Sequence, residues 1–213
     1  MKKKVTLAFD MDDTLCLTGE YINLGLNFVA QRVNKPELAE FVRVNKDHIS
    51  TMLYPPEIKK YVDNFIIGPG DYMLDAKPSE LMETNIIQRL ASRYKDHEVT
   101  LVVCSHRGFH QYGEIYTRVW LDKYGVAHHF DEIHMLDGKV YPNKMDFLKK
   151  TYPDSHIVLV DDNPLHDFTK EHEKVEGIVI YDWVHQFPGY KHQDRYNSMT
   201  QFFHRIDTLL GIA

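Results

Sequence analysis

The sequence is poor in cysteine and in long apolar runs. Its two cysteines in 213 residues, Cys16 and Cys104, lie in or just after segments expected to be β-strands. They therefore suit buried thiols in a reducing compartment better than a disulfide scaffold. The residues after Lys2–Lys4 resemble the start of a signal peptide, but Asp10 ends their apolar run far below the length of a signal peptide or a membrane span. We expect a cytoplasmic protein without membrane contact.

Positive charge is not in excess, because 25 lysines and arginines stand against 31 aspartates and glutamates, which gives a formal net charge of −6. A protein that wraps long nucleic acid neutralises many phosphates and needs an extended basic surface. We therefore expect no stable nucleic-acid complex. A small phosphorylated molecule requires only a local positive site, so it stays open as a partner, and so does an oligomer of this chain.

The composition and the order of apolar segments predict an α/β fold. Apolar residues make up 43% and charged residues 26% of the chain, which is near the average for globular proteins. Short apolar, β-rich runs alternate with stretches of helical spacing, and this order is typical of a parallel sheet that is buried on both sides. We predict a Rossmann-like parallel sheet with helices on both faces. Its strands are expected at residues 5–9, 99–104, 133–136, 157–160 and 178–181.

Apolar residues at helical spacing mark several helices whose apolar stripes should face the core. A helix over residues 199–210 is expected to close the chain. The stripes consist of Ile22, Leu26, Val29 and Val33; of Ile58, Tyr61, Val62 and Phe65; of Met82, Ile86, Leu90 and Tyr94; and of Ile115, Val119 and Trp120.

The first two expected strands are separated by a gap, from about residue 17 to residue 98, that is far too long for one crossover helix. Tyr54-Pro55-Pro56 and Gly68-Pro69-Gly70 break this segment into several short helices. We predict a small helical cap at residues 17–79, inserted after the first strand. Residues 1–16 and 80–213 would then form the core.

Three carboxylates follow the first expected strand, at Asp10, Asp12 and Asp13. Like charges this close repel one another and cost solvation energy, so a structural role explains them poorly. A bound cation would compensate them, and oxygen ligands of this kind suit Mg²⁺.

The ends of later strands supply further polar groups, and in an open α/β sheet these ends meet at the ligand site. The second strand leads into Ser105, His106 and Arg107, which offer a hydroxyl, an imidazole and a guanidinium. Lys144 follows the third strand at the start of a helix, where it can reach a phosphate. Asp161 and Asp162 follow the fourth strand. The pattern predicts a cation and a phosphate bound side by side.

These motifs resemble those of the haloacid dehalogenase superfamily of phosphohydrolases. The order is Asp-x-Asp-x-Thr after strand one, Ser after strand two, Lys before a helix and Asp-Asp after strand four. The resemblance implies that Asp10 attacks phosphorus as the nucleophile and that Asp12 is the general acid and base. Ser105 and Lys144 would hold phosphoryl oxygens, and Thr14 would support the loop of the first motif.

The resemblance also implies a Mg²⁺ cofactor. Its ligands would be Asp10, the backbone carbonyl of Asp12, and an aspartate of the fourth motif. Asp162 is the expected direct ligand, with Asp161 as its partner or alternate.

The substrate class is less closely defined. The modest cap, the Asp-Asp motif and the Gly-Pro-Gly turn resemble the 5'(3')-deoxyribonucleotidase branch, so a nucleoside monophosphate is the first candidate. Phe65 and Tyr72 could then stack on the base, or be ordinary buried cap residues.

The second motif departs from that branch, because Cys-Ser-His-Arg-Gly stands where Thr-Ser-Pro is usual. A polynucleotide end phosphatase, another small-metabolite phosphatase and a non-catalytic nucleotide-binding protein stay open as alternatives. Arg107 could touch substrate or brace Asp162, and His106 could touch substrate or only stabilise its loop.

Overall fold

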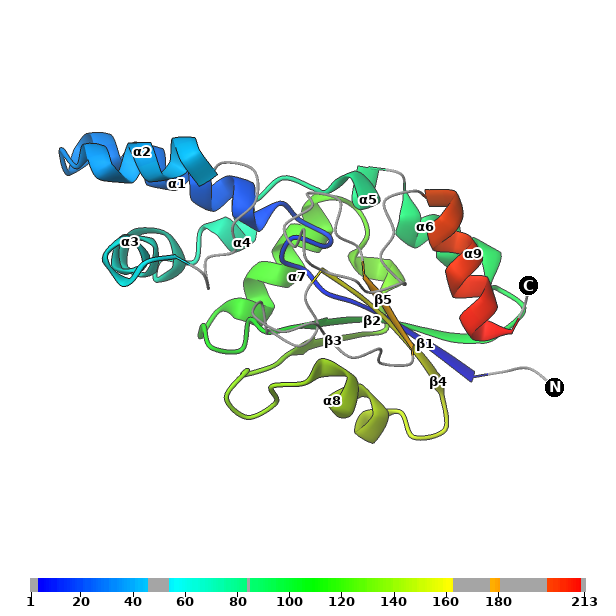
Figure 1. Cartoon of the computed structure of the whole chain (residues 1–213). Helices are drawn as coiled ribbons and strands as arrows, with labels where there is room; N and C mark the ends of the chain where they lie inside the picture. The colour runs from blue at the N-terminus through cyan, green and yellow to red at the C-terminus, as the bar shows by residue number, and fades with distance from the viewer. Residues whose placement is uncertain (1–3, 46–53, 84, 163–176, 181–198, 212–213) are drawn as a thin grey trace.

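A computed structural model describes residues 4–45, 54–83, 85–162, 177–180 and 199–211. Its centre is a five-stranded sheet in the order β3-β2-β1-β4-β5, in which every neighbouring pair is parallel (Figure 1). The predicted α/β class is confirmed, and each strand lies within two residues of its expected position. The strands are β1 Lys4–Phe9, β2 Glu98–Ser105, β3 Glu132–Met135, β4 His156–Asp161 and β5 Ile178–Ile180.

Helices cover both faces of the sheet, as predicted (Figure 1). Alternate side chains of a strand point to opposite faces, so Leu7 and Phe9 of β1 pack on one side and Ala8 on the other. The first side is covered by α6 (Ile86–Arg93), α7 (Gly113–Lys123) and α9 (Met199–Leu210), and the second by α8 (Lys144–Thr151).

The segment between β1 and β2 is mainly helical and forms a hydrophobic core of its own. Ile22, Leu26, Leu38, Val62 and Ile66 belong to this separate apolar cluster. Figure 1 shows α1, α2 and α3 together beyond the edge of the sheet. The division into residues 17–79 and the rest stays a prediction. The elements are α1 Thr18–Arg32, α2 Pro36–Asn45, α3 Pro56–Val62, the π-helix η2 Asp63–Ile67, α4 Tyr72–Asp75 and α5 Glu80–Glu83.

Two of the predicted apolar stripes are wrong in part. Ile115 and Val119 of α7 are 58% and 49% exposed, because the buried face of this helix carries Thr117 and Trp120 instead. Phe65 is 54% exposed on the cap. Since side chains three and four residues apart share a helix face, Thr117, Trp120 and Leu121 form a consistent buried stripe.

The single helix expected around Met82, Ile86, Leu90 and Tyr94 is divided into α5 and α6. The division falls next to Asn85, whose backbone is left-handed with φ of 56°. Asparagine is among the few residues that adopt this conformation readily, and one such residue is enough to end a right-handed helix.

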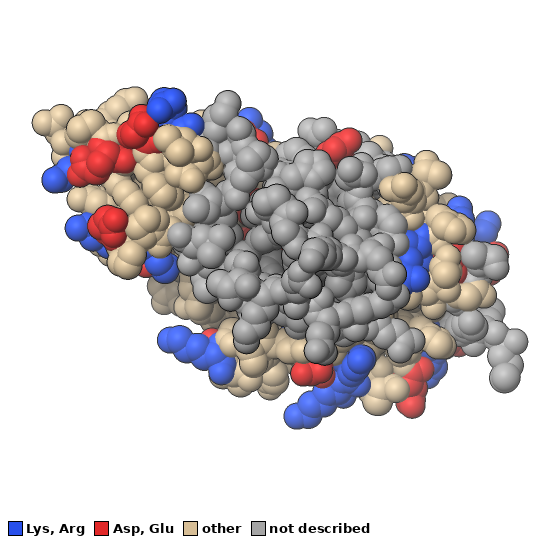
Figure 2. Space-filling view, in the orientation of Figure 1, with Lys and Arg blue, Asp and Glu red and all other residues tan. Residues whose placement is uncertain are grey.

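Charged side chains of both signs lie on the surface, and both cysteines are buried. On the face shown in Figure 2, lysine and arginine are interspersed with aspartate and glutamate over the described part of the cap. Among the described residues, none of the helices has the length and apolar character that crossing a membrane requires. Cys16 and Cys104 are both free and buried, as expected, and burial raises the pKa of each thiol to about 12.

Candidate active site

The acidic residues meet where the strand order reverses. From β1 the chain runs to β2 and β3 on one side, then crosses to β4 on the other, so the carboxyl ends of β1 and β4 border the switch point. Phe9 is in register with Val103 of β2 and with Val160 of β4. The next residues, Asp10 and Asp161, therefore lie at the same level of neighbouring strands.

Lys144 lies between these two aspartates. Its Nζ is 2.8 Å from Asp10 Oδ1 and 2.8 Å from Asp161 Oδ2. The side chain is fully buried at the start of α8, whose first turn is capped by the Asn143 side chain. Burial opposes the charge on Lys144, but Asp10 and Asp161 outweigh it and raise the lysine pKa above its ordinary value. The lysine is therefore a permanent positive charge beside the expected nucleophile.

Asp162 completes the cluster. Asp10, Asp161 and Asp162 each offer a carboxylate oxygen, and these oxygens lie within 4.8 Å of one another. Burial, followed by the charges of Asp161, Asp13 and Asp10, raises the pKa of Asp162 well above its ordinary value. Three carboxyl groups lie beside one ammonium, so the cluster is short of positive charge. The donor type and this charge deficit fit a divalent cation such as Mg²⁺, which prefers carboxylate oxygens.

Asp12 is held by a different cation. Arg107 donates from Nε to Asp12 Oδ2 at 2.9 Å and from Nη2 to Oδ1 at 2.6 Å, while Thr18 Oγ1 donates to Oδ1 at 2.5 Å. Burial acts to raise the pKa of Asp12, but the charge and hydrogen bonds of Arg107 outweigh it and hold that pKa below its ordinary value. Asp12 is therefore ionised here and fixed in one orientation.

The guanidinium of Arg107 is fully buried and has further partners. Its Nη1 donates to Thr117 Oγ1 at 3.0 Å, its Nη2 to Cys16 Sγ at 3.2 Å, and its Cζ lies 5.7 Å from the ring centre of Tyr72. Bidentate pairing suits the planar guanidinium fork. These contacts tie the first motif to α7 and to α4 of the cap.

The role expected for Arg107 is corrected by this geometry. The residue was expected to touch substrate or to brace Asp162, whereas it binds Asp12. Two glycines allow its loop to turn back: a side chain at Gly113 would collide with the carbonyl oxygen of Arg107, and one at Gly108 with the backbone at Leu136. These glycines were the available sequence signal for a tightly packed loop, but they do not indicate its partner.

Thr14 links the first and fourth motifs. Its buried hydroxyl accepts a hydrogen bond from the backbone N–H of Asp162 at 3.0 Å, and its carbonyl accepts from Ser79 Oγ at 2.6 Å. Asp13 has a left-handed backbone with φ of 55°, and its carboxylate accepts from the N–H of Gly19 at 2.8 Å. The sequence pattern predicts no role for Thr18, and none for Asp13 other than its place among the three carboxylates.

Ser105 is the last residue of β2 and His106 follows it, but the two side chains have different surroundings. Ser105 is buried at the end of the strand, near the level of Asp10. His106 Nε2 lies 2.7 Å from the carbonyl oxygen of Tyr141. Burial, followed by the charge of Lys144, lowers the pKa of His106, which favours a neutral ring that donates to this carbonyl. This contact is of the kind expected of a loop-stabilising residue.

The two aromatic candidates for base binding are also in different surroundings. Tyr72 is 3% exposed and packs against Arg107, so its ring supports the guanidinium and does not offer a free stacking face. Burial, and after it the charge of Asp12, raises the tyrosine pKa well above its ordinary value. Phe65 is exposed, and its ring stacks on Tyr61 within the cap, 6.4 Å between centres.

Comparisons by sequence and by structure give different results. No protein-family model matches the chain, and no curated protein sequence matches it. Solved structures do. A predicted phosphatase from Clostridium acetobutylicum has a TM-score of 0.52 at 16% identity, covering 96% of this chain and 98% of its own.

Two hydrolases of the haloacid dehalogenase superfamily are similar as well. One from Bacillus subtilis, solved with bound magnesium, has a TM-score of 0.55 at 13% identity over 97% of this chain and 100% of that one. One of subfamily IA from Geobacter sulfurreducens has a TM-score of 0.56 at 12% identity over 96% and 97%. The chain shares the fold of these hydrolases. At such low identity the likeness shows the fold alone.

Proposed function

We propose that this protein is a Mg²⁺-dependent phosphomonoesterase of the haloacid dehalogenase superfamily that works through an aspartyl-phosphate intermediate. The observation that carries the proposal is the cluster of Asp10, Asp161 and the half-buried Asp162 beside Lys144, at the switch point of the sheet. The fold shared with hydrolases supports it. The cluster combines a nucleophile, a cation site and a fixed positive charge for an anionic substrate.

In the first step, Asp10 Oδ attacks phosphorus, and the bond from phosphorus to the ester oxygen breaks. The departing oxygen takes a proton from Asp12. In the second step, Asp12 takes a proton from water, which attacks the aspartyl phosphate and releases inorganic phosphate. Lys144 and Ser105 hold the phosphoryl oxygens, and Thr14 keeps the two acidic loops together.

The contacts of Asp12 favour the second step. Arg107 stabilises the carboxylate form, which is the form that accepts a proton from water. For the first step Asp12 has to carry a proton, and it must then release at least one of its contacts with Arg107. Arg107 is thus a positioning residue that acts on substrate through Asp12.

Asp10, the backbone carbonyl of Asp12, and Asp162 or Asp161 would hold Mg²⁺. When bound, the ion offsets negative charge and allows an anionic nucleophile to approach an anionic phosphate. The magnesium bound to the Bacillus subtilis hydrolase is consistent with this cofactor.

A nucleoside monophosphate is the proposed substrate, as in the deoxyribonucleotidase branch that the motifs resemble. The polynucleotide-end alternative depended on an arginine that is free to grip phosphate. Arg107 is fully buried against Asp12, so that alternative loses its main support. A non-catalytic nucleotide-binding protein would have no need for the paired Asp10 and Asp12.

The test is phosphate release from a panel of 5'- and 3'-mononucleotides, sugar phosphates and 3'-phosphorylated oligonucleotides, with Mg²⁺ and with EDTA. We expect Mg²⁺-dependent release with a preference for mononucleotides. Preference for oligonucleotide ends or sugar phosphates would refute the nucleotidase proposal and leave the chemistry intact. No release from any substrate would refute the enzymatic function.

A further inference from the structure

Four aromatic rings lie together directly after the loop of Arg107. The ring centre of His110 is 6.4 Å from Phe109, 5.9 Å from Tyr112 and 5.7 Å from Tyr116, and the two tyrosine rings are 5.5 Å apart. We call these four residues the aromatic shelf. Phe109 is 54% exposed and Tyr112 is 44% exposed, so the shelf offers rings to solvent.

The shelf is attached to the cap. His110 Nε2 lies 3.3 Å from the carbonyl oxygen of Gly68, and a side-chain carbon at Gly70 would come within 2.8 Å of the His110 ring. Gly70 has φ of 81°, a conformation that other residues rarely adopt. The Gly-Pro-Gly turn thus places cap backbone against the shelf, at the border between the cap and the core.

The shelf also lies at the edge of the sheet where the candidate active site lies. Figure 1 shows the loop between β2 and α7 at the end of the sheet that faces the cap. Phe109 follows Ser105 by four residues, so their Cα atoms are at most about 14 Å apart. Two backbone hydrogen bonds hold this loop. Gly108 N–H donates to the carbonyl of Leu136, and His110 N–H donates to the carbonyl of Arg107 within the loop.

Exposed aromatic rings lose the benefit of burial, and a fixed group of them next to a ligand site is typical of a binding surface. The flat aromatic faces of Phe109, Tyr112 and Tyr116 suit a planar group such as a nucleobase. In a nucleotide, one sugar ring separates such a group from the phosphate. A phosphate bound near Ser105 would therefore leave its base within reach of the shelf.

We propose that the aromatic shelf, with Phe109 as its most exposed ring, binds the base of the phosphorylated substrate. This inference rests on the proposed function, because it takes Ser105 and Lys144 as the phosphate site. It moves base recognition from the cap residues Phe65 and Tyr72 to the core. Stacking of a base on an aromatic side chain corresponds to an effect of about 5- to 150-fold on affinity.

The test compares Phe109→Ala with Phe65→Ala, since both phenylalanines are 54% exposed in the free protein. Each variant is assayed with deoxythymidine 5'-monophosphate and with ribose 5-phosphate, which has no base. We expect Phe109→Ala to raise KM for the nucleotide about 10-fold or more and to leave kcat/KM for ribose 5-phosphate within about twofold of wild type. Phe65→Ala should change neither value by that much.

A binding measurement separates failure of this inference from failure of the proposed function. Calorimetric titration of deoxythymidine 5'-monophosphate into Asp10→Asn, with and without Phe109→Ala, needs no turnover. We expect the second substitution to weaken binding by a similar factor. Equal affinity with and without Phe109, equal losses for both substrates, or a nucleotide-selective loss in Phe65→Ala instead would each overturn the inference.

Discussion

Replacing Arg107 by methionine should lower the free energy of unfolding by about 3 kcal/mol. The substitution keeps most of the buried volume but removes the guanidinium, which leaves the Asp12 carboxylate without its bidentate partner. Breaking one side of a buried ion pair costs about 3–5 kcal/mol. We expect the lower end of that range, because the Asp12 side chain is 29% exposed and water can replace part of the interaction.

The assay is urea-induced unfolding followed by circular dichroism, with Arg118→Met as the matched control. Arg118 also pairs with a carboxylate, Glu114, but both side chains are more than half exposed. Exposed pairs of this kind contribute about 0.3–0.5 kcal/mol. Asp12→Asn combined with Arg107→Met should cost at least about 1 kcal/mol less than the sum of the two single changes.

Two results would contradict a stabilising role for this ion pair. Arg107→Met could prove no more destabilising than Arg118→Met, in which case the ion pair with Asp12 contributes little. Alternatively, the effects of Asp12→Asn and Arg107→Met could simply add. Additivity would mean that the two side chains do not stabilise one another in solution.

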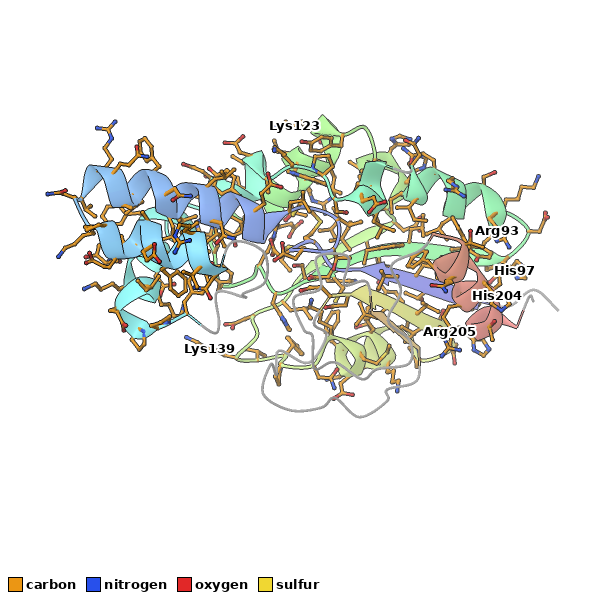
Figure 3. All side chains as sticks on the ribbon, turned by 45° about the horizontal axis from the view of Figure 1, so that its top comes forward. Arg93, His97, Lys123, Lys139, His204 and Arg205 are labelled. Carbon is orange, nitrogen blue, oxygen red and sulfur yellow. The ribbon has the colours of Figure 1, made fainter. Side chains whose placement is uncertain are left out.

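Four further predictions follow from other contacts. Mg²⁺ should raise the Tm of the wild type in differential scanning fluorimetry, and Asp162→Asn should reduce this increase by half or more; equal increases would exclude Asp162 as a ligand. Lys144→Met should abolish phosphate release and lower Tm in EDTA, because Asp10 and Asp161 lose their shared ammonium; an unchanged Tm would contradict this. Gly113→Ala should cost about 1–3 kcal/mol in urea unfolding, since its methyl group collides with the carbonyl oxygen of Arg107, and full stability would show that the loop adapts freely. Asp207 accepts hydrogen bonds from Tyr94 and from Arg93, which is labelled in Figure 3, and these bonds lower the pKa of Asp207 although burial acts to raise it. Asp207→Asn should therefore lower the free energy of unfolding by about 1 kcal/mol at pH 7, and this difference from wild type should shrink as the pH falls below about 4. A difference that does not depend on pH would exclude the carboxylate charge as its cause.

The sheet and the acidic cluster could be predicted because both depend on local patterns. A strand of four to eight residues shows its apolar character within its own sequence, and parallel strands bring their carboxyl ends to one edge. Asp10 and Asp161 are 151 positions apart, yet each follows an apolar strand directly. Their meeting required only the fold class and no knowledge of side-chain conformation.

The partner of Arg107 could not be predicted in the same way. Its distance from Asp12 is 95 positions, and the pairing depends on how a glycine-flanked loop turns back after β2. The same guanidinium also contacts the buried face of α7. This face carries Thr117, which accepts a hydrogen bond from the guanidinium, while Ile115 and Val119 face outward. The apolar pattern of a helix does not show which buried polar group elsewhere in the fold needs a hydrogen-bond partner from that helix.

The role of Tyr72 likewise depends on tertiary packing. The sequence places it just after the Gly-Pro-Gly turn, where both a buried and an exposed ring are compatible with the pattern. The structure buries it over Arg107, while the rings that remain exposed near the second motif belong to a stretch that the sequence did not single out.

The proposed mechanism requires Asp10 to carry the phosphoryl group during turnover. The most direct measurement is mass spectrometry of the enzyme after acid quenching in the steady state with Mg²⁺ and a nucleoside monophosphate. We expect a phosphorylated peptide that contains Asp10, and no such peptide from Asp10→Asn or in the presence of EDTA. Phosphorylation of another residue, or undiminished phosphate release by Asp10→Asn, would contradict it.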